Sequence, residues 1–120
     1  MDNLNEQCHW SSVDFKLQSK GIYIELKYRQ IESNRYDTSV FDKKKVDRWL
    51  VDNVLSKSDI YIALVYSDNK HYFIKYDRDL FNSFDTQYLP NWDTTNYLIP
   101  LDKCIGLVEF VKIIKQSTLG

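Results

Sequence analysis

The sequence predicts an α/β fold with a mixed β-sheet, and three patterns support that prediction. Apolar and polar residues alternate on both sides of a turn between residues 12 and 28, as they do in a β-hairpin. An amphipathic helical spacing follows, and the continuously apolar run 60–66 comes next. A strand, a helix and a buried strand in this order form a β-α-β unit, which indicates parallel strands within the sheet.

The hairpin has one apolar and one charged face. With its loop at residues 18–21, the numbers of directly opposed residues sum to 39, so Phe15 lies opposite Ile24 and Asp14 lies opposite Glu25. Every pair on the Phe15 face is apolar, which predicts that this face is buried. The opposite face carries Asp14, Glu25 and Lys27, and Arg29 extends the row if the strand continues.

The next elements follow from periodicity. Residues 29–41 show none and are expected to be a polar connection. From the N-cap Asp42, the apolar residues Val46 and Trp49 recur at helical spacing, and the pattern continues to Val54. The run 60–66 is expected to be a central strand covered on both faces.

The last third of the chain completes the sheet. Residues 72–76 are predicted to form a second hairpin with the run 60–66, followed by a short helix or helical turn at 77–84. Residues 97–101 are expected to form a short edge strand. Asp102 is expected to cap a final helix that ends near Gln116 and packs on the sheet.

Composition favours a single domain spanning residues 1–120. The chain has 120 residues, of which 43% are hydrophobic and 28% are charged, a balance typical of globular proteins. No run approaches the ~20 apolar residues that cross a bilayer, and no secretory leader is recognisable, so no membrane association is expected. Cys8 and Cys104 match no metal-ligand spacing and are expected to be free thiols, which favours a cytoplasmic or nuclear location.

Charge is distributed unevenly along the chain. The net charge is −1, which argues against binding nucleic acid by bulk electrostatics, but residues 16–57 hold ten bases and only six acids. Four of these bases lie at the start of the predicted helix and are candidates for contact with a phosphate backbone. The alternative is that they form an ordinary solvated helix start. They are Lys43, Lys44, Lys45 and Arg48.

The opposed carboxylates are the strongest candidate for chemistry. Directly opposed residues have Cβ atoms ~4.5–5.5 Å apart, where like charges destabilise a hairpin unless something compensates them. A Mg²⁺ ion held by Asp14 and Glu25 would do so, since Mg²⁺ is commonly bound by one or two carboxylates with water and phosphate oxygens. Lys27 on the same face could then orient or deprotonate a metal-bound water. The alternative is an ordinary solvated face of charged residues.

Val13-Asp14-Phe15, followed after ten residues by Glu25-Leu26-Lys27, resembles the signature of the PD-(D/E)XK nuclease superfamily. The resemblance implies a restriction endonuclease-like core of order α-β-β-β-α-β, here with a shortened N-terminal helix. It also implies phosphodiester hydrolysis with Mg²⁺, for which Mn²⁺ can substitute. By this resemblance Asp14, Glu25 and the Leu26 carbonyl are metal ligands and Lys27 acts on the attacking water, while Glu6 is the candidate for a further acid.

Two functions are therefore expected from the sequence. The first is a metal-dependent DNA endonuclease, structure-selective or acting as a homodimer, with Asp14, Glu25 and Lys27 as catalytic residues. In that reading Arg29 and the basic residues at the helix start contact the DNA. The alternative is an inactive nuclease-like module that binds nucleic acid or a protein partner.

Overall fold

A computed structural model describes residues 2–3, 15–17 and 21–119. This part of the chain forms an α/β fold with one mixed sheet of five strands and one antiparallel sheet of three. The strands are β1 (Asp2–Asn3), β2 (Phe15–Leu17), β3 (Ile22–Arg29), β4 (Thr38–Asp42), β5 (Asp59–Tyr66), β6 (His71–Lys75), β7 (Thr86–Leu89) and β8 (Thr94–Pro100). The helices are α2 (Lys43–Val51), α3 (Arg78–Asn82) and α4 (Leu107–Leu119), with 3-10 turns η1 (Leu55–Lys57) and η2 (Leu101–Lys103).

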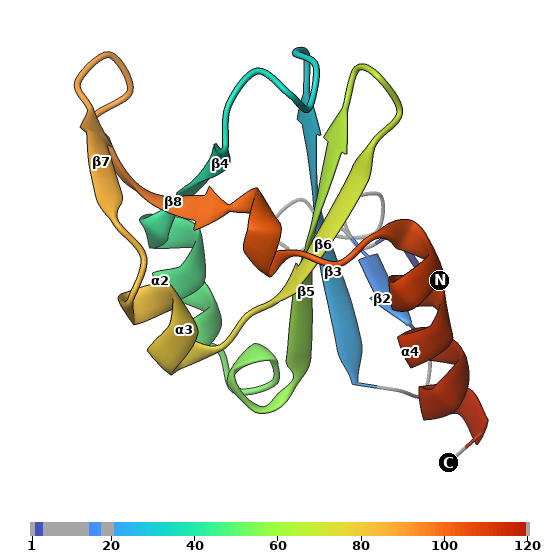
Figure 1. Ribbon diagram of the computed structural model, residues 1–120. Helices are drawn as coiled ribbons and strands as arrows, with labels where there is room; N and C mark the ends of the chain where they lie inside the picture. Colours follow the sequence, from blue (N-terminus) through green and yellow to red (C-terminus); the bar gives the residue numbers. More distant parts are fainter. Residues whose placement is uncertain (1, 4–14, 18–20, 120) are drawn as a thin grey trace.

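The two sheets divide the molecule into two sides. Strands β1-β2-β3-β5-β6 form the mixed sheet, and β4-β8-β7 form the antiparallel one. Figure 1 shows α2 and α3 on the side of the antiparallel sheet and α4 at the opposite side, against the mixed sheet. No helix within the described ranges is both long and apolar enough to cross a membrane.

The predicted register of the first hairpin is confirmed where it is described. Phe15 lies opposite Ile24 and Leu17 opposite Ile22, in an antiparallel ladder. Gly21 has a φ of +63°, a left-handed conformation that glycine adopts without steric cost. The predicted pair of Asp14 with Glu25 lies outside the described residues, because residues 4–14 are not among them.

The β-α-β prediction is also confirmed. Strand β3 pairs in parallel with β5 along its whole length, from Ile22 beside Asp59 to Arg29 beside Tyr66. The connection between these strands contains β4 and α2, and β6 then returns antiparallel to β5. As a result, β3 and β5 lie inside the sheet with a neighbouring strand on each side.

Both faces of β3 are covered, so the prediction of one apolar buried face and one open charged face is wrong at its centre. Ile22 and Ile24 face the core beneath α4, whereas Tyr23 belongs to the core beneath α2. Glu25 lies two residues beyond Tyr23 on the same face and is buried as well. Leu26, which was expected on the buried apolar face, is exposed and does not belong to the core beneath α4.

Helix α2 begins where the sequence predicted. The Asp42 side chain accepts a hydrogen bond from the backbone N–H of Lys44 at 2.9 Å, as an N-cap residue does. Val46 and Trp49 are its buried residues. The helix ends at Val51, earlier than predicted, because the Asp52 carboxylate accepts bonds from two following backbone N–H groups and starts η1.

The predicted polar connection at 29–41 and the predicted edge strand at 97–101 are both corrected. Thr38–Asp42 is strand β4, and it pairs with β8, which lies between β4 and β7 at the centre of the second sheet. Burial alternates along β4, but the first buried residue is Ser39, so hydrophobicity does not reveal the period. Strand β8 is central because β4 pairs with one of its edges and β7 with the other. The hydrophobic pattern of β8 alone does not indicate how many neighbouring strands it has.

The final helix starts later than predicted. Asp102 lies in the 3-10 turn η2, and α4 begins at Leu107. Between them, Ile105 forms an isolated bridge with Phe73 of β6, with both backbone bonds at 2.8 Å. Because those backbone groups are committed to the sheet, the helix can begin only after Gly106.

Candidate active site

Glu25 is the centre of the candidate site. It lies in the middle of β3, beside Ile62 of the neighbouring parallel strand, and only 1% of it is exposed. A buried carboxylate requires compensation for its lost hydration. The reading of this residue as part of a solvated charged face is therefore wrong.

Two lysines compensate the Glu25 charge. The Nζ of Lys45 lies 2.7 Å from Oε1 of Glu25, and the Nζ of Lys27 lies 3.7 Å from the same oxygen. Lys27 comes from β3 itself and Lys45 from the first turn of α2. The exposed fractions of the two lysine side chains are 35% and 24%, so both lie between Glu25 and solvent.

Lys27 has the geometry that the sequence predicted relative to Glu25. The two residues are separated by two positions, so their side chains share one face of the strand. Its Nζ also lies 5.8 Å from the centre of the Phe41 ring, within the range of a cation–π contact. The ammonium therefore stays near the carboxylate while remaining partly exposed to solvent.

Arg29 continues the same row, as predicted, but its contacts differ from those of an exposed DNA-binding residue. Its Nε donates to Ser39 Oγ at 3.1 Å, and its Nη2 donates to the carbonyl of Val40. Burial lowers the pKa of the guanidinium, and the nearby Tyr66 acts in the opposite direction. Arg29 thus joins the mixed sheet to the antiparallel sheet.

The basic residues at the start of α2 separate into two groups. Lys43, Lys44 and Arg48 are exposed and remain available to a polyanion. Lys45 faces Glu25 instead. It precedes the buried Trp49 by four residues and therefore shares its side of the helix, a spacing from which this orientation could have been anticipated.

The donor types suit a hard divalent cation in part. Glu25 supplies a carboxylate, and the Leu26 carbonyl is the neighbouring oxygen that the PD-(D/E)XK resemblance implies as a ligand. Asp14 and Glu6, the other predicted ligands, lie outside the described residues. Among the residues that the structure describes, no three or more His, Cys, Asp or Glu side chains are placed to bind a metal together. Glu25 is thus the one carboxylate among the predicted metal ligands whose position the structure describes.

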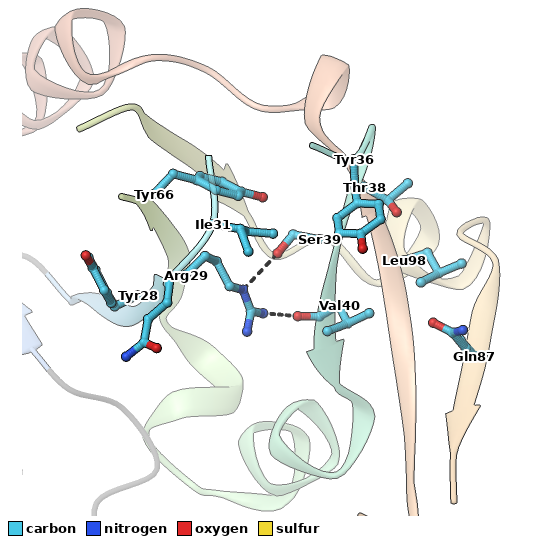
Figure 2. Close-up of a pocket in the computed structure, with 11 residues that line it drawn as sticks. Tyr28, Arg29, Ile31, Tyr36, Thr38, Ser39, Val40, Tyr66, Gln87 and Leu98 are labelled. Carbon is cyan, nitrogen blue, oxygen red and sulfur yellow. Dashed lines mark hydrogen bonds between the residues drawn. The ribbon is translucent and has the colours of Figure 1, made fainter. Parts of the chain in front are cut away.

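Sequence reasoning missed a cavity beside this row. It has a volume of about 520 Å³ and lies at the carboxyl ends of the parallel strands β3 and β5, between them and the second sheet. Figure 2 shows Arg29 reaching from β3 toward Ser39 and Val40 of β4 within this cavity. Its lining comes from five strands and a connecting loop, so no local sequence pattern could have identified it.

Cys104 is confirmed as a free thiol, whereas Cys8 lies outside the described residues. Burial, reinforced by Asp102, raises the pKa of the Cys104 thiol to about 12. At pH 8 only about one thiol in 10⁴ is then ionised, and the thiolate is the reactive form.

The reactivity of Cys104 can be measured in a Cys8→Ser protein, in which it is the remaining cysteine. Iodoacetamide is expected to alkylate Cys104 at least ~100-fold more slowly in the folded protein than in denaturant, because the folded thiol is almost entirely protonated. Mass spectrometry would measure both alkylation rates. Equal rates would contradict a half-buried thiol with a raised pKa.

Comparison with known proteins adds no assignment. No protein-family model, curated protein or solved structure matches this chain.

Proposed function

We propose that this protein is a metal-dependent endonuclease that hydrolyses phosphodiester bonds in DNA. The observation that carries the proposal is the placement of Glu25 and Lys27 on one face of a hairpin strand, with Nζ and Oε1 3.7 Å apart. A carboxylate beside an ammonium that remains partly exposed can bind a cation and act on a nearby water.

In this proposal each charged residue has a separate role in metal binding, water activation or DNA binding. Asp14, Glu25 and the Leu26 carbonyl hold Mg²⁺, which when bound supplies charge stabilisation to the phosphate and acidifies a water. Lys27 orients the attacking water and supplies positive charge near the phosphate. Lys45 balances the Glu25 carboxylate in the metal-free protein, and Lys43, Lys44 and Arg48 attract the DNA backbone.

The order of elements supports the proposal further. Strands β2, β3 and β4 are followed by α2 and then by β5, which corresponds to the β-β-β-α-β part of the order implied by the PD-(D/E)XK resemblance. Strand β4 nevertheless pairs with β8 rather than with β3. We further propose that the enzyme acts as a homodimer on branched or duplex DNA, since a two-fold axis would place one site on each strand.

One observation favours the second candidate function, an inactive module that binds nucleic acid or a protein. Lys45 pairs with Glu25 at 2.7 Å, the distance of a strong charge-assisted hydrogen bond. A cation at Glu25 must displace or share this contact. If Lys45 retains the carboxylate permanently, the charged face is structural and the exposed lysines serve binding alone.

Cleavage of a DNA panel distinguishes the two functions. Supercoiled plasmid, linear duplex, single strand and a four-way junction are incubated with Mg²⁺ or Mn²⁺ and wild-type, Lys27→Ala or Lys57→Ala protein, all purified identically. We expect the Lys27 variant to lose at least ~100-fold of the cleavage rate, as for the loss of a group that stabilises charge in the transition state, and the exposed control Lys57→Ala to cut normally. Equal cutting by all three proteins, or none by the wild type, would exclude the nuclease proposal.

A further inference from the structure

The cavity beside Arg29 has the composition of a binding site for an anionic ligand. No aspartate or glutamate is among the residues that line it, although charged residues make up 28% of the chain. Arg29 lies on one side of the cavity, and Ser39 and Thr38 of β4 lie on the other (Figure 2). Gln30 and Gln87 add side-chain amides, each of which can donate and accept hydrogen bonds.

The Arg29 guanidinium has N–H donors that no described residue accepts from. A guanidinium carries five N–H donors, and within the described part of the chain Arg29 gives two of them, to Ser39 and to Val40. It also has no carboxylate within ion-pair distance among the described residues. A half-buried cation without an anionic partner is costly, and a bound phosphate would compensate its charge through several N–H groups.

Aromatic rings complete the cavity. Tyr66, at the end of β5, is buried in its wall, whereas Tyr36 is 58% exposed and stands at the opposite side in Figure 2. The Arg35 guanidinium lies 5.8 Å from the centre of the Tyr36 ring and adds positive charge there. An exposed ring beside a cationic wall is the arrangement on which unpaired bases stack.

We propose that this cavity binds one nucleotide, with its phosphate on Arg29 and its base stacked on Tyr36. The inference rests on the proposed nuclease function and specifies its substrate as DNA with an unpaired nucleotide near the cleaved bond. Arg29 follows Glu25 by four residues on the same strand, a separation of about 13 Å at the rise of a β-strand. That distance equals about four steps of a B-form strand, so one substrate can reach both sites.

Binding without metal tests the cavity independently of cleavage. A short fluorescein-labelled single strand, the same strand with one abasic position, and its duplex are titrated with protein in EDTA and followed by anisotropy. Unlabelled nucleoside monophosphate serves as competitor. We expect the intact single strand to bind more tightly than the duplex and than the abasic strand. If the monophosphate displaces the labelled strand at a concentration similar to that of unlabelled strand, the natural ligand of the cavity is a free nucleotide. If it displaces the strand only weakly, the natural ligand is a nucleotide within a DNA strand.

Variants assign the binding to the cavity. Tyr36→Ala is expected to weaken single-strand binding about 5- to 150-fold, the effect of losing one stacked base, whereas Tyr36→Phe retains the ring and binds as the wild type does. Trp92→Ala removes an exposed aromatic outside the cavity and is expected to change nothing. Arg29→Lys retains the positive charge but loses the forked N–H donors of the guanidinium. We expect it to weaken the binding of the single strand and of the monophosphate to a similar extent.

The outcomes separate the two proposals. Wild-type binding by both Tyr36→Ala and Arg29→Lys would overturn the nucleotide site even if Lys27→Ala abolishes cleavage. Conversely, normal cleavage by Lys27→Ala together with impaired binding by Tyr36→Ala would exclude the catalytic assignment and retain the cavity. Lys57→Ala, an exposed residue outside the cavity, is expected to bind single strands as the wild type does.

Discussion

Replacing Trp49 with alanine is expected to lower the free energy of unfolding by about 3–5 kcal/mol, the usual cost of removing a buried aromatic side chain. Trp49 is among the largest fully buried side chains of the described core. Its ring lies 5.6 Å from that of Phe41 and 6.0 Å from that of Tyr76, measured between centroids. Removing it takes away the contacts of α2 with Phe41 of β4 and with Tyr76, which follows β6.

Urea unfolding followed by far-UV circular dichroism would measure this effect. Val51→Ala, on the same helix but with 82% of the side chain exposed, is the matched control and is expected to stay within about 0.5 kcal/mol of the wild type. Trp49→Phe keeps an aromatic ring in the core, and its free energy of unfolding should fall by less than that of Trp49→Ala. A Trp49→Ala protein as stable as the Val51 control would contradict the position of α2 described here.

Replacing Lys45 with methionine is expected to cost about 3 kcal/mol of stability, because it leaves the buried Glu25 carboxylate without its nearest ammonium. The expected loss is at the low end of the range for broken buried pairs, since Lys27 remains 3.7 Å from the same oxygen. Methionine preserves most of the apolar length of the lysine, so the change reports on the charge rather than on packing.

The neighbouring residue provides the control for this experiment. Lys44 is exposed, and Lys44→Met is expected to change the unfolding free energy by less than about 0.5 kcal/mol. A double variant, Glu25→Leu with Lys45→Met, removes both charges and is expected to recover most of the stability lost in Lys45→Met. If the double variant is instead less stable than Lys45→Met, the ion pair does not explain the effect of Lys45.

The fold could be predicted where the pattern is local. The hairpin register, the N-cap at Asp42 and the parallel pairing through a helix all follow from spacing along the chain, and the structure confirms them where it describes them. The second sheet was not predicted. Its strand β4 buries Ser39 as well as Phe41, so its alternation is not hydrophobic, and its partner β8 lies more than fifty residues later in the sequence.

The candidate site shows the same division. The two-residue spacing of Glu25 and Lys27 places both on one face, and the ion pair between them agrees with that prediction. The contact of Lys45 with Glu25 and the cavity beside Arg29 depend on how α2 and β4 pack against β3. No pattern within β3 contains that information.

By itself, the sequence determined the fold class, the register of the first hairpin and the face shared by Glu25 and Lys27, because these depend on the fixed periods of strands and helices. Only the tertiary structure decided that Glu25 is buried, that Lys45 pairs with it and that Arg29 lines a cavity. Burial and long-range charge pairing arise from distant segments packing together. Their physical cause is the removal of water from a surface that no single element forms alone.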